Sequence, residues 1–449
     1  MRLVTIIAAF GLILPCAGPH FAAAAPYEDD LTGASDAKGS RPNIIFVLAD
    51  DLGYGDIGAN GATMIATPHI DRLAAEGVRL TSFYAPANVC TPSRAGFLTG
   101  RHPIRMGLAA GVIFPQSTHG LPQAETTLPE LLKTRGYHTA MVGKWHLGHT
   151  PEFWPTEHGF DSFYGVPYSN DMTPFPLYDG AEKIEEPADQ STLTERYTAA
   201  AVAAIETAGD GPFFLYVAHT FPHIPLFASE EFRARSQAGL YGDTVETIDW
   251  SMGELRAALE RTGKAEDTLI VFTSDNGPWF EGDAGVSRDR KGSGWEGAYR
   301  VPFIAWWPGG LPSGGTVGEP VSGLDLFPTF AGLAGAEPSD RVVLDGRDIW
   351  PVLRGEAPSP HDHLLFFDED QIAAVRRGDW RLVLQSYYKT YDVPLDAFGY
   401  PLLFDLSRDP GETYSLAREE PERTSAMLEL VEQARSELDV PEREPFSPE

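Results

Sequence analysis

Short, continuous apolar segments alternate with helical patterns along most of this chain. The apolar segments include NIIFVLA from residue 43, HTAMVG from 138, FFLYVA from 213 and TLIVFT from 268. The segments between them carry helix signals, such as Thr67 before PHIDRLAAE, Pro68 at its first position and Gly77 after it. Buried strands that alternate with helices are typical of a largely parallel sheet covered on both faces. We therefore predict an α/β fold with a largely parallel central sheet flanked by helices.

The pattern changes near residue 350. HLLFFDEDQIAAVRRGDWRLVLQ (363–385) and PLLFDLSRDPGE (401–412) predict short antiparallel strands joined by turns, and residues 421–439 predict a terminal helix. We expect a catalytic domain over 41–350 and a smaller C-terminal α+β subdomain with a short antiparallel sheet over 351–449.

The first residues have the layout of a secretory signal. MRLVTIIAAFGLIL is a short basic start followed by an apolar run, and small residues lead to Ala24 and Ala25. We predict a signal peptide over 1–25 and an exported protein, periplasmic or secreted, with no membrane association after cleavage. Removal of the signal takes Cys16 with it, which leaves Cys90 as the one cysteine and excludes an internal disulfide.

Charge and composition narrow the function classes. The formal net charge of −30 argues against a nucleic-acid partner, and the 43% of hydrophobic residues argues against a disordered chain. An anion-binding site in such a protein requires a local group of cations or a metal ion, because salt screens distant surface charge beyond about 8–10 Å.

Polar side chains follow the apolar segments at the point where each strand is expected to end. Asp50 and Asp51 follow the first, and Asp275 and Asn276 follow the last. Either pair alone is most simply a turn or a helix cap, but the carboxyl ends of parallel strands meet at one sheet edge. Four oxygen donors at one edge predict a site for Ca²⁺ or Mg²⁺ rather than Zn²⁺.

Cations are expected at the same edge. Lys144 and His146 are two residues apart, so on an extended strand their side chains face the same way. Lys291 lies in the Gly-containing RKGSGWEG segment, and His223 follows another strand. Alone, each is an ordinary surface or core residue. With Arg94 they predict a group able to hold a tetrahedral oxyanion.

The segment CTPSRAGFLTGR surrounds Cys90. Residues 93–100 predict a helix, which puts Cys90 near its N-terminus, where free N–H groups favour anions. A lone cysteine is usually inert and buried, and a papain-like nucleophile would leave the acidic and cationic groups unexplained.

These residues resemble the type I sulfatases, the formylglycine-dependent family. The likeness rests on the complete C-x-P-S-R motif and on ADDLGYGD, GKWHLG, TSDNG and RKGSGWEGAYRVP. Within the family, the chain is similar to arylsulfatase A and N-acetylgalactosamine-6-sulfatase. The resemblance implies an alkaline-phosphatase-like sandwich, conversion of Cys90 to 3-oxoalanine (Cα-formylglycine) by a maturation enzyme, and hydrolysis of sulfate monoesters.

The resemblance also implies a role for each matching residue. The metal ligands, with Ca²⁺ ahead of Mg²⁺, would be Asp50, Asp51, Cys90, Asp275 and Asn276. The sulfate-binding residues would be Lys144, Ser169, His223 and Lys291. The catalytic residues would be Cys90, Arg94, His146, Asp275, His223 and Lys291.

In the implied mechanism, one hydroxyl of the formylglycine hydrate, deprotonated by Asp275, attacks sulfur, and His223 or Lys291 protonates the leaving alcohol. His146 then deprotonates the second hydroxyl, and the sulfated-enzyme intermediate releases sulfate.

Two other functions remain open at this point. A phosphonate or phosphate monoester hydrolase of the same superfamily is the enzymatic alternative, and a sulfated-glycan binding protein with an inactive site is the other. We expect a sulfated small molecule or glycan as the substrate, a sulfated carbohydrate above all, with aryl sulfates as artificial substrates.

Overall fold

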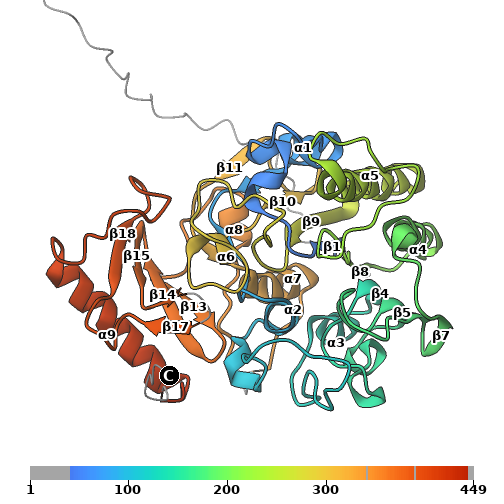
Figure 1. Cartoon of the computed structure of the whole chain (residues 1–449). Helices are drawn as coiled ribbons and strands as arrows, with labels where there is room; N and C mark the ends of the chain where they lie inside the picture. The colour runs from blue at the N-terminus through green and yellow to red at the C-terminus, as the bar shows by residue number, and fades with distance from the viewer. Residues whose placement is uncertain (1–40, 340–341, 389–390, 443–449) are drawn as a thin grey trace, which may run out of the picture. The chain divides into compact units, whose positions relative to one another are not determined.

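One sheet of ten strands organises the part of the chain that the computed structural model describes, residues 41–339, 342–388 and 391–442 (Figure 1). In spatial order the strands are β11 (Gly315–Val317), β2 (Val78–Leu80), β10 (Phe303–Trp306), β9 (Thr268–Ser274), β1 (Asn43–Ala49), β8 (Phe213–Ala218), β4 (His138–Lys144), β5 (Ser162–Val166), β6 (Leu177–Asp179) and β7 (Glu182–Glu185). Strands β9, β1, β8, β4 and β5 are parallel, and β10 is antiparallel to β9. The four apolar segments of the sequence are the adjacent central strands, which confirms the predicted sheet.

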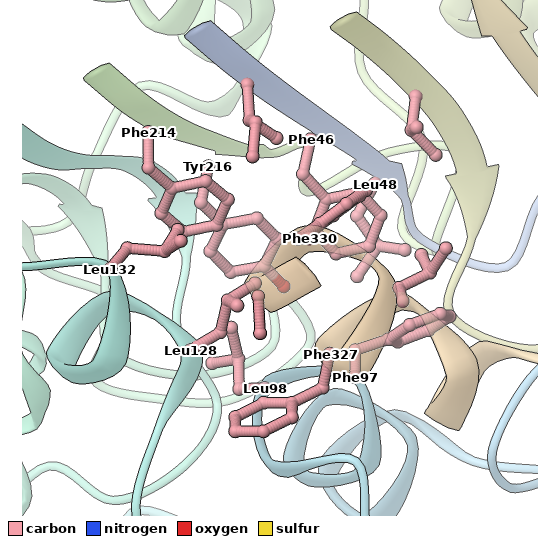
Figure 2. Close-up of a cluster of buried hydrophobic side chains, with 14 of the residues drawn as sticks. Phe46, Leu48, Phe97, Leu98, Leu128, Leu132, Phe214, Tyr216, Phe327 and Phe330 are labelled. Carbon is pink, nitrogen blue, oxygen red and sulfur yellow. The ribbon is translucent and has the colours of Figure 1, made fainter. Parts of the chain in front are cut away.

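Alternate residues of β1 enter two separate hydrophobic cores. Ile44, Phe46 and Leu48 pack on one face with residues of α2, α3 and α7, as Figure 2 shows for Phe46 and Leu48. Ile45 and Val47 pack on the other face with residues of α1, α4 and α5. Because both faces of the strand are buried, its sequence is continuously apolar rather than alternating.

The helices of the described residues are α1 (Pro68–Glu76), α2 (Cys90–Thr99), α3 (Leu128–Lys133), α4 (Leu193–Thr207), α5 (Gly239–Thr262), α6 (Glu296–Tyr299), α7 (Leu326–Ala334), α8 (Trp350–Leu353) and α9 (Pro421–Glu437). The ends of α1, α2 and α9 lie within three residues of those predicted from the sequence. In α3, the Thr127 hydroxyl accepts a hydrogen bond from the Glu130 N–H, and the Glu130 carboxylate accepts one from the Thr127 N–H. This reciprocal cap fixes the start of α3.

A smaller antiparallel sheet follows the main sheet in the chain. It contains β13 (Leu364–Asp368), β14 (Gln371–Arg377), β15 (Trp380–Val383) and β18 (Leu402–Asp405). Met427 and Val431 of α9 pack against it. Two-stranded pairs complete the pattern: β16 (Gln385–Tyr388) with β17 (Tyr391–Pro394), and β3 (Phe83–Tyr84) with β12 (Val321–Ser322). The predicted C-terminal α+β subdomain with a short antiparallel sheet is confirmed, whereas its boundary at residue 350 stays a prediction.

The predicted signal peptide, residues 1–25, lies outside the described residues. Among the residues that are described, no helix combines the length and the apolar character needed to cross a bilayer.

Candidate active site

The acidic pairs meet because their strands are neighbours in register. Ala49, the last residue of β1, pairs with Ser274, the last residue of β9. Asp50–Asp51 and Asp275–Asn276 therefore leave the sheet side by side, and the Asp51 N–H donates to Asp275 Oδ1 at 3.2 Å. All four side chains are buried. The structure thus brings together the four oxygen donors that the strand ends predict.

A group of atoms at this edge is able to hold a metal ion. One ligand atom from each of Asp50, Asp51, Cys90 and His223 lies within 4.8 Å of the others. Asn276 adds a buried Oδ1 with no hydrogen-bond partner in the described structure, while its Nδ2 donates to Asp51 Oδ1 at 2.8 Å. An unpartnered buried carbonyl oxygen beside two carboxylates fits a hard cation. Asp275 lies outside the close group.

Residues of the C-x-P-S-R motif both line the site and attach α2 to the main sheet. Cys90 is the first residue of α2, and its Sγ lies 3.5 Å from Asp50 Oδ1. The Ser93 hydroxyl donates to the Asp275 backbone oxygen. Arg94 donates from Nε at 3.0 Å and Nη2 at 2.8 Å to Asp275 Oδ2, and from Nη1 at 2.8 Å to the Lys144 carbonyl. Ser93 and Arg94 therefore anchor α2 to the end of β9.

Two lysines face the buried carboxylates from opposite segments. Lys144, at the end of β4, donates to Asp50 Oδ2 and, at 3.2 Å, to the Ser169 hydroxyl. Lys291 donates to Asp51 Oδ2 at 2.8 Å and to Cys90 Sγ at 3.4 Å. His223 Nε2 lies 3.4 Å from Ser169 Oγ and 3.7 Å from Asp51 Oδ2. The two lysines and His223 therefore surround the carboxylate oxygens of Asp50 and Asp51. Arg94 Nη2 also lies 3.3 Å from Asp50 Oδ2, but the guanidinium makes its hydrogen bonds to Asp275 and to the Lys144 carbonyl.

The expectation that Lys144 and His146 share one face of an extended strand is wrong. Strand β4 ends at Lys144, and His146 has a left-handed backbone with φ of 61°. The His146 N–H donates to the Pro167 carbonyl at 3.0 Å, so the bend is fixed at the end of the neighbouring strand. The His146 ring Nε2 lies 3.0 Å from the Ile113 carbonyl, and its buried Nδ1 has no partner in the described structure. With Nε2–H donating, Nδ1 carries the free lone pair.

The charges in this cluster shift several pKa values. Burial alone would raise the pKa of Asp50, but Lys144 and Arg94 hold it well below its usual range. Burial and the charge of Asp50 raise the pKa of the Cys90 thiol and that of Asp275. Burial, with Lys144 and Arg94, lowers the pKa of His146.

Sequence reasoning missed two residues that fix these side chains. Asn170 Oδ1 lies 3.1 Å and the Ile224 carbonyl 2.5 Å from His223 Nδ1, so Asn170 shares in orienting that ring. The Thr91 hydroxyl donates to the His146 carbonyl at 2.9 Å and accepts from the Ile113 N–H at 3.1 Å. Both contacts join segments that are distant in sequence, so no local pattern predicts them. The only sequence signal was position: Thr91 is the variable residue of C-x-P-S-R, and Asn170 follows Ser169.

His219 lies apart from these contacts. It is fully buried, both its ring nitrogens lack a partner in the described residues, and burial lowers its pKa to about 4.

Comparison with known proteins decides the family. Residues 42–336 match the model of the family described as Sulfatase, and residues 359–443 match that of the C-terminal region of aryl-sulfatase. The chain belongs to the sulfatase family. It is a sulfate ester hydrolase of the arylsulfatase or glycan sulfatase type.

Curated relatives and solved structures cover most of this sulfatase. It is 40% identical to arylsulfatase A from Homo sapiens over 87% of this chain and 86% of the relative. It is 37% identical to N-acetylgalactosamine-6-sulfatase from Mus musculus over 84% of this chain and 82% of the relative. The structure of Ps i-CgsB in complex with k-i-k-neocarrahexaose superposes with a TM-score of 0.79 at 30% identity, over 88% of this chain and 93% of that one. The resemblance found in the motifs and the alkaline-phosphatase-like fold are confirmed.

Proposed function

We propose that this sulfatase hydrolyses sulfated carbohydrates at a site made of Cys90, oxidised to Cα-formylglycine, and a bound Ca²⁺. One observation carries the proposal: residue 90 begins a helix at the point where two carboxylates and two lysines converge. Transfer of a charged sulfuryl group requires a nucleophile close to a bound cation, because the cation stabilises the negative charge on the sulfate oxygens. A separate maturation enzyme would carry out the oxidation.

The residues divide into a cation side and a sulfate side. Asp50, Asp51 and the unpartnered Asn276 Oδ1 would hold the cation, with Asp275 kept in place by Arg94. Lys144, His223, Ser169 and Lys291 would bind sulfate oxygens. When present, the aldehyde hydrate supplies a hydroxyl nucleophile, and the cation supplies positive charge for the sulfate oxygens. His146 Nδ1, whose lone pair is free, would accept a proton, and His223 or Lys291 would donate one to the leaving alcohol.

Exposed aromatic rings beside the Lys291 segment support a sugar substrate. Phe280 is 68% exposed and Tyr387 is 48% exposed. The Arg290 guanidinium lies 4.9 Å from the Phe280 ring centroid, and the Tyr387 hydroxyl hydrogen-bonds Asp289. The two rings therefore contact the residues one and two positions before Lys291. Aromatic faces of this kind suit the stacking of a sugar ring.

The chemistry at residue 90 is tested by mass spectrometry of the peptide that contains Cys90, from protein matured in its native system. We expect the mass of formylglycine or its hydrate, and metal analysis of the same sample should give about one Ca²⁺ per chain. An unmodified thiol in protein that still hydrolyses sulfate esters would contradict the proposal. A thiol in inactive protein would mean that maturation had failed in that sample, which would then be remade with the maturation enzyme.

The substrate class is tested with two aromatic variants. We expect F280A and Y387A to lower kcat/KM for a sulfated oligosaccharide about tenfold and to leave hydrolysis of 4-nitrophenyl sulfate within twofold of wild type. Tyr414, which is 76% exposed and follows the DPGE segment, gives the matched control Y414A, which should change neither. Equal losses on both substrates would contradict a sugar subsite.

Export to the periplasm or the medium is proposed from the leader sequence. N-terminal sequencing of the mature protein tests it, and we expect the first residue to lie near Ala25.

A further inference from the structure

Residues 288–297 carry Lys291, and the middle of this segment is bonded to the residues that follow β9 and precede α2. We call it the lysine segment. Besides the contacts of Lys291 Nζ, the Lys291 N–H donates to the Pro278 carbonyl at 3.0 Å, and the Gly292 N–H donates to the Asn88 carbonyl at 3.0 Å. The Ser293 carbonyl also accepts from Asn88 Nδ2 at 3.2 Å, and Glu296 Oε1 accepts from the Tyr84 hydroxyl at 2.6 Å.

Further attachments come from the C-terminal part of the chain. Arg381, on β15, donates to the Gly294 carbonyl at 2.9 Å and forms an ion pair with Glu412. Glu412, in the DPGE segment, accepts from the Glu296 N–H at 2.9 Å, and its backbone carbonyl accepts from Arg288 Nη1 at 2.9 Å. Arg381 and Glu412 therefore hold the lysine segment at Arg288, Gly294 and Glu296, on both sides of Lys291.

This arrangement is costly if stability is its only purpose. The Arg381 and Glu412 side chains are fully buried, and Glu296, also buried, lies 3.3 Å from Arg381 Nε. Desolvation of such charges commonly offsets their attraction, so apolar residues of similar size stabilise a fold at least as well. Glu412 also has a left-handed backbone with φ of 50°, which is uncommon outside glycine. A buried ion pair does, however, fix direction and distance, which apolar contacts do not.

We propose that Arg381 and Glu412 are positioning residues: they hold the lysine segment from the C-terminal subdomain so that Lys291 reaches the sulfate. The inference rests on the proposed role of Lys291 in binding sulfate. It gives the subdomain a part in the reaction although Arg381 and Glu412 contact none of Asp50, Asp51 and Cys90 in the described structure.

A double-mutant cycle separates positioning from general support of the fold. We expect K291A to lower kcat/KM for 4-nitrophenyl sulfate about 100-fold and E412Q to lower it about tenfold. If Glu412 acts through Lys291, the K291A/E412Q double variant should remain within about twofold of K291A. Losses that multiply to about 1000-fold, or an E412Q protein with full activity, would overturn the proposal.

A second variant and a structural readout cover the case in which E412Q folds poorly. R381K keeps the charge but removes the fork that joins Glu412 to Gly294, and the same cycle with K291A should again show no added loss. Hydrogen exchange of peptides spanning 288–297 should rise in R381K and stay unchanged across β1 and β9. Unchanged exchange in 288–297 would overturn the proposal.

The control removes the carboxylate of a different ion pair, one that is partly buried. Asp345 bonds Arg105 at 2.8 Å, with no contact to the lysine segment in the described structure. We expect D345N to lower stability while leaving kcat/KM within twofold of wild type. If D345N lowers kcat/KM as much as E412Q does, loss of stability explains both and the positioning role is overturned. If the wild-type protein hydrolyses sulfate esters but the losses of kcat/KM in K291A and E412Q multiply in the double variant, only this inference is refuted and the proposed function stands.

Discussion

At the scale of single residues, the site depends on polar side chains that act on other side chains. Ser93, Arg94 and Thr91 are neighbours of Cys90 in sequence, yet their hydrogen bonds go to Asp275 and to the segments around His146 and Ile113. The motif therefore has a structural role besides its proposed role in the modification of Cys90. It fastens the start of α2 to two strand ends, which sets where residue 90 lies relative to the carboxylates.

Asn170 offers a test at this scale. Its Oδ1 orients His223 through Nδ1 together with the Ile224 carbonyl, which remains in N170A, so we expect N170A to lower kcat/KM for an aryl sulfate about fivefold to tenfold with little change in unfolding free energy. Gln190 bonds the far side of Asn170, with Asn170 Nδ2 donating to Gln190 Oε1 at 3.0 Å. Q190A should therefore cost less than threefold. Equal effects of the two substitutions would show that Asn170 does not orient the ring.

At the scale of elements, close backbone contact between β4 and β8 positions Lys144 in the site. Gly143 precedes it in β4, with φ of 107°, and a Cβ there would lie 1.8 Å from the Ala218 carbonyl oxygen of β8. We expect G143A to destabilise the protein by about 3 kcal/mol or more, because the two strands would have to separate. Gly107 has φ of 72° and open space around it, so G107A should cost only about 1 kcal/mol. Urea unfolding of both variants makes the comparison, and equal losses would contradict it.

A helix terminus provides a pH-dependent test. Asp249 of α5 is buried and accepts from the His69 N–H at 3.3 Å and the Ile70 N–H at 2.8 Å, in the first turn of α1. Burial raises the pKa of Asp249 from 3.8 to about 7. The folded state then binds this proton more tightly than the unfolded chain does, so its contribution to stability falls as pH rises from about 4 to 7. The variant D249N lacks this dependence.

We therefore expect the unfolding free energy of D249N, relative to wild type, to increase by about 2–3 kcal/mol between pH 5 and pH 8. Urea unfolding at the two pH values measures it. A difference that stays constant or decreases would show that Asp249 is already ionised at pH 5.

At the scale of the whole molecule, a strongly acidic protein binds an anionic substrate. The chain carries 64 acidic and 34 basic residues, a net charge of −30. At about 10 mM salt, the Debye length of about 30 Å lets surface charge repel a sulfated substrate, and at 150 mM it shrinks to about 8 Å. We expect kcat/KM for a sulfated oligosaccharide to rise about twofold to fivefold over that range. A fall would mean that local cations attract the substrate more strongly than the whole surface repels it.

Much of the fold and of the site was predictable from local sequence. Continuous apolar strands showed a parallel sheet, and Asp50, Asp51, Asp275 and Asn276 showed where its strands end. Such patterns are informative because strand burial and strand-end chemistry are properties of consecutive residues. The intact motif around Cys90 led to the correct family for the same reason, since its letters are contiguous.

The remaining features depended on residues that are distant in sequence. The left-handed bend that directs His146, the engagement of Arg94 by Asp275, and the attachment of the lysine segment to Arg381 and Glu412 all join separate segments. No local pattern encodes such contacts, because a side chain's partner is decided by which strands become neighbours. The sequence by itself determined the sheet, the family chemistry and the residue types at the site. The tertiary structure alone decided which atoms face one another, since hydrogen bonds and ion pairs depend on distance in space.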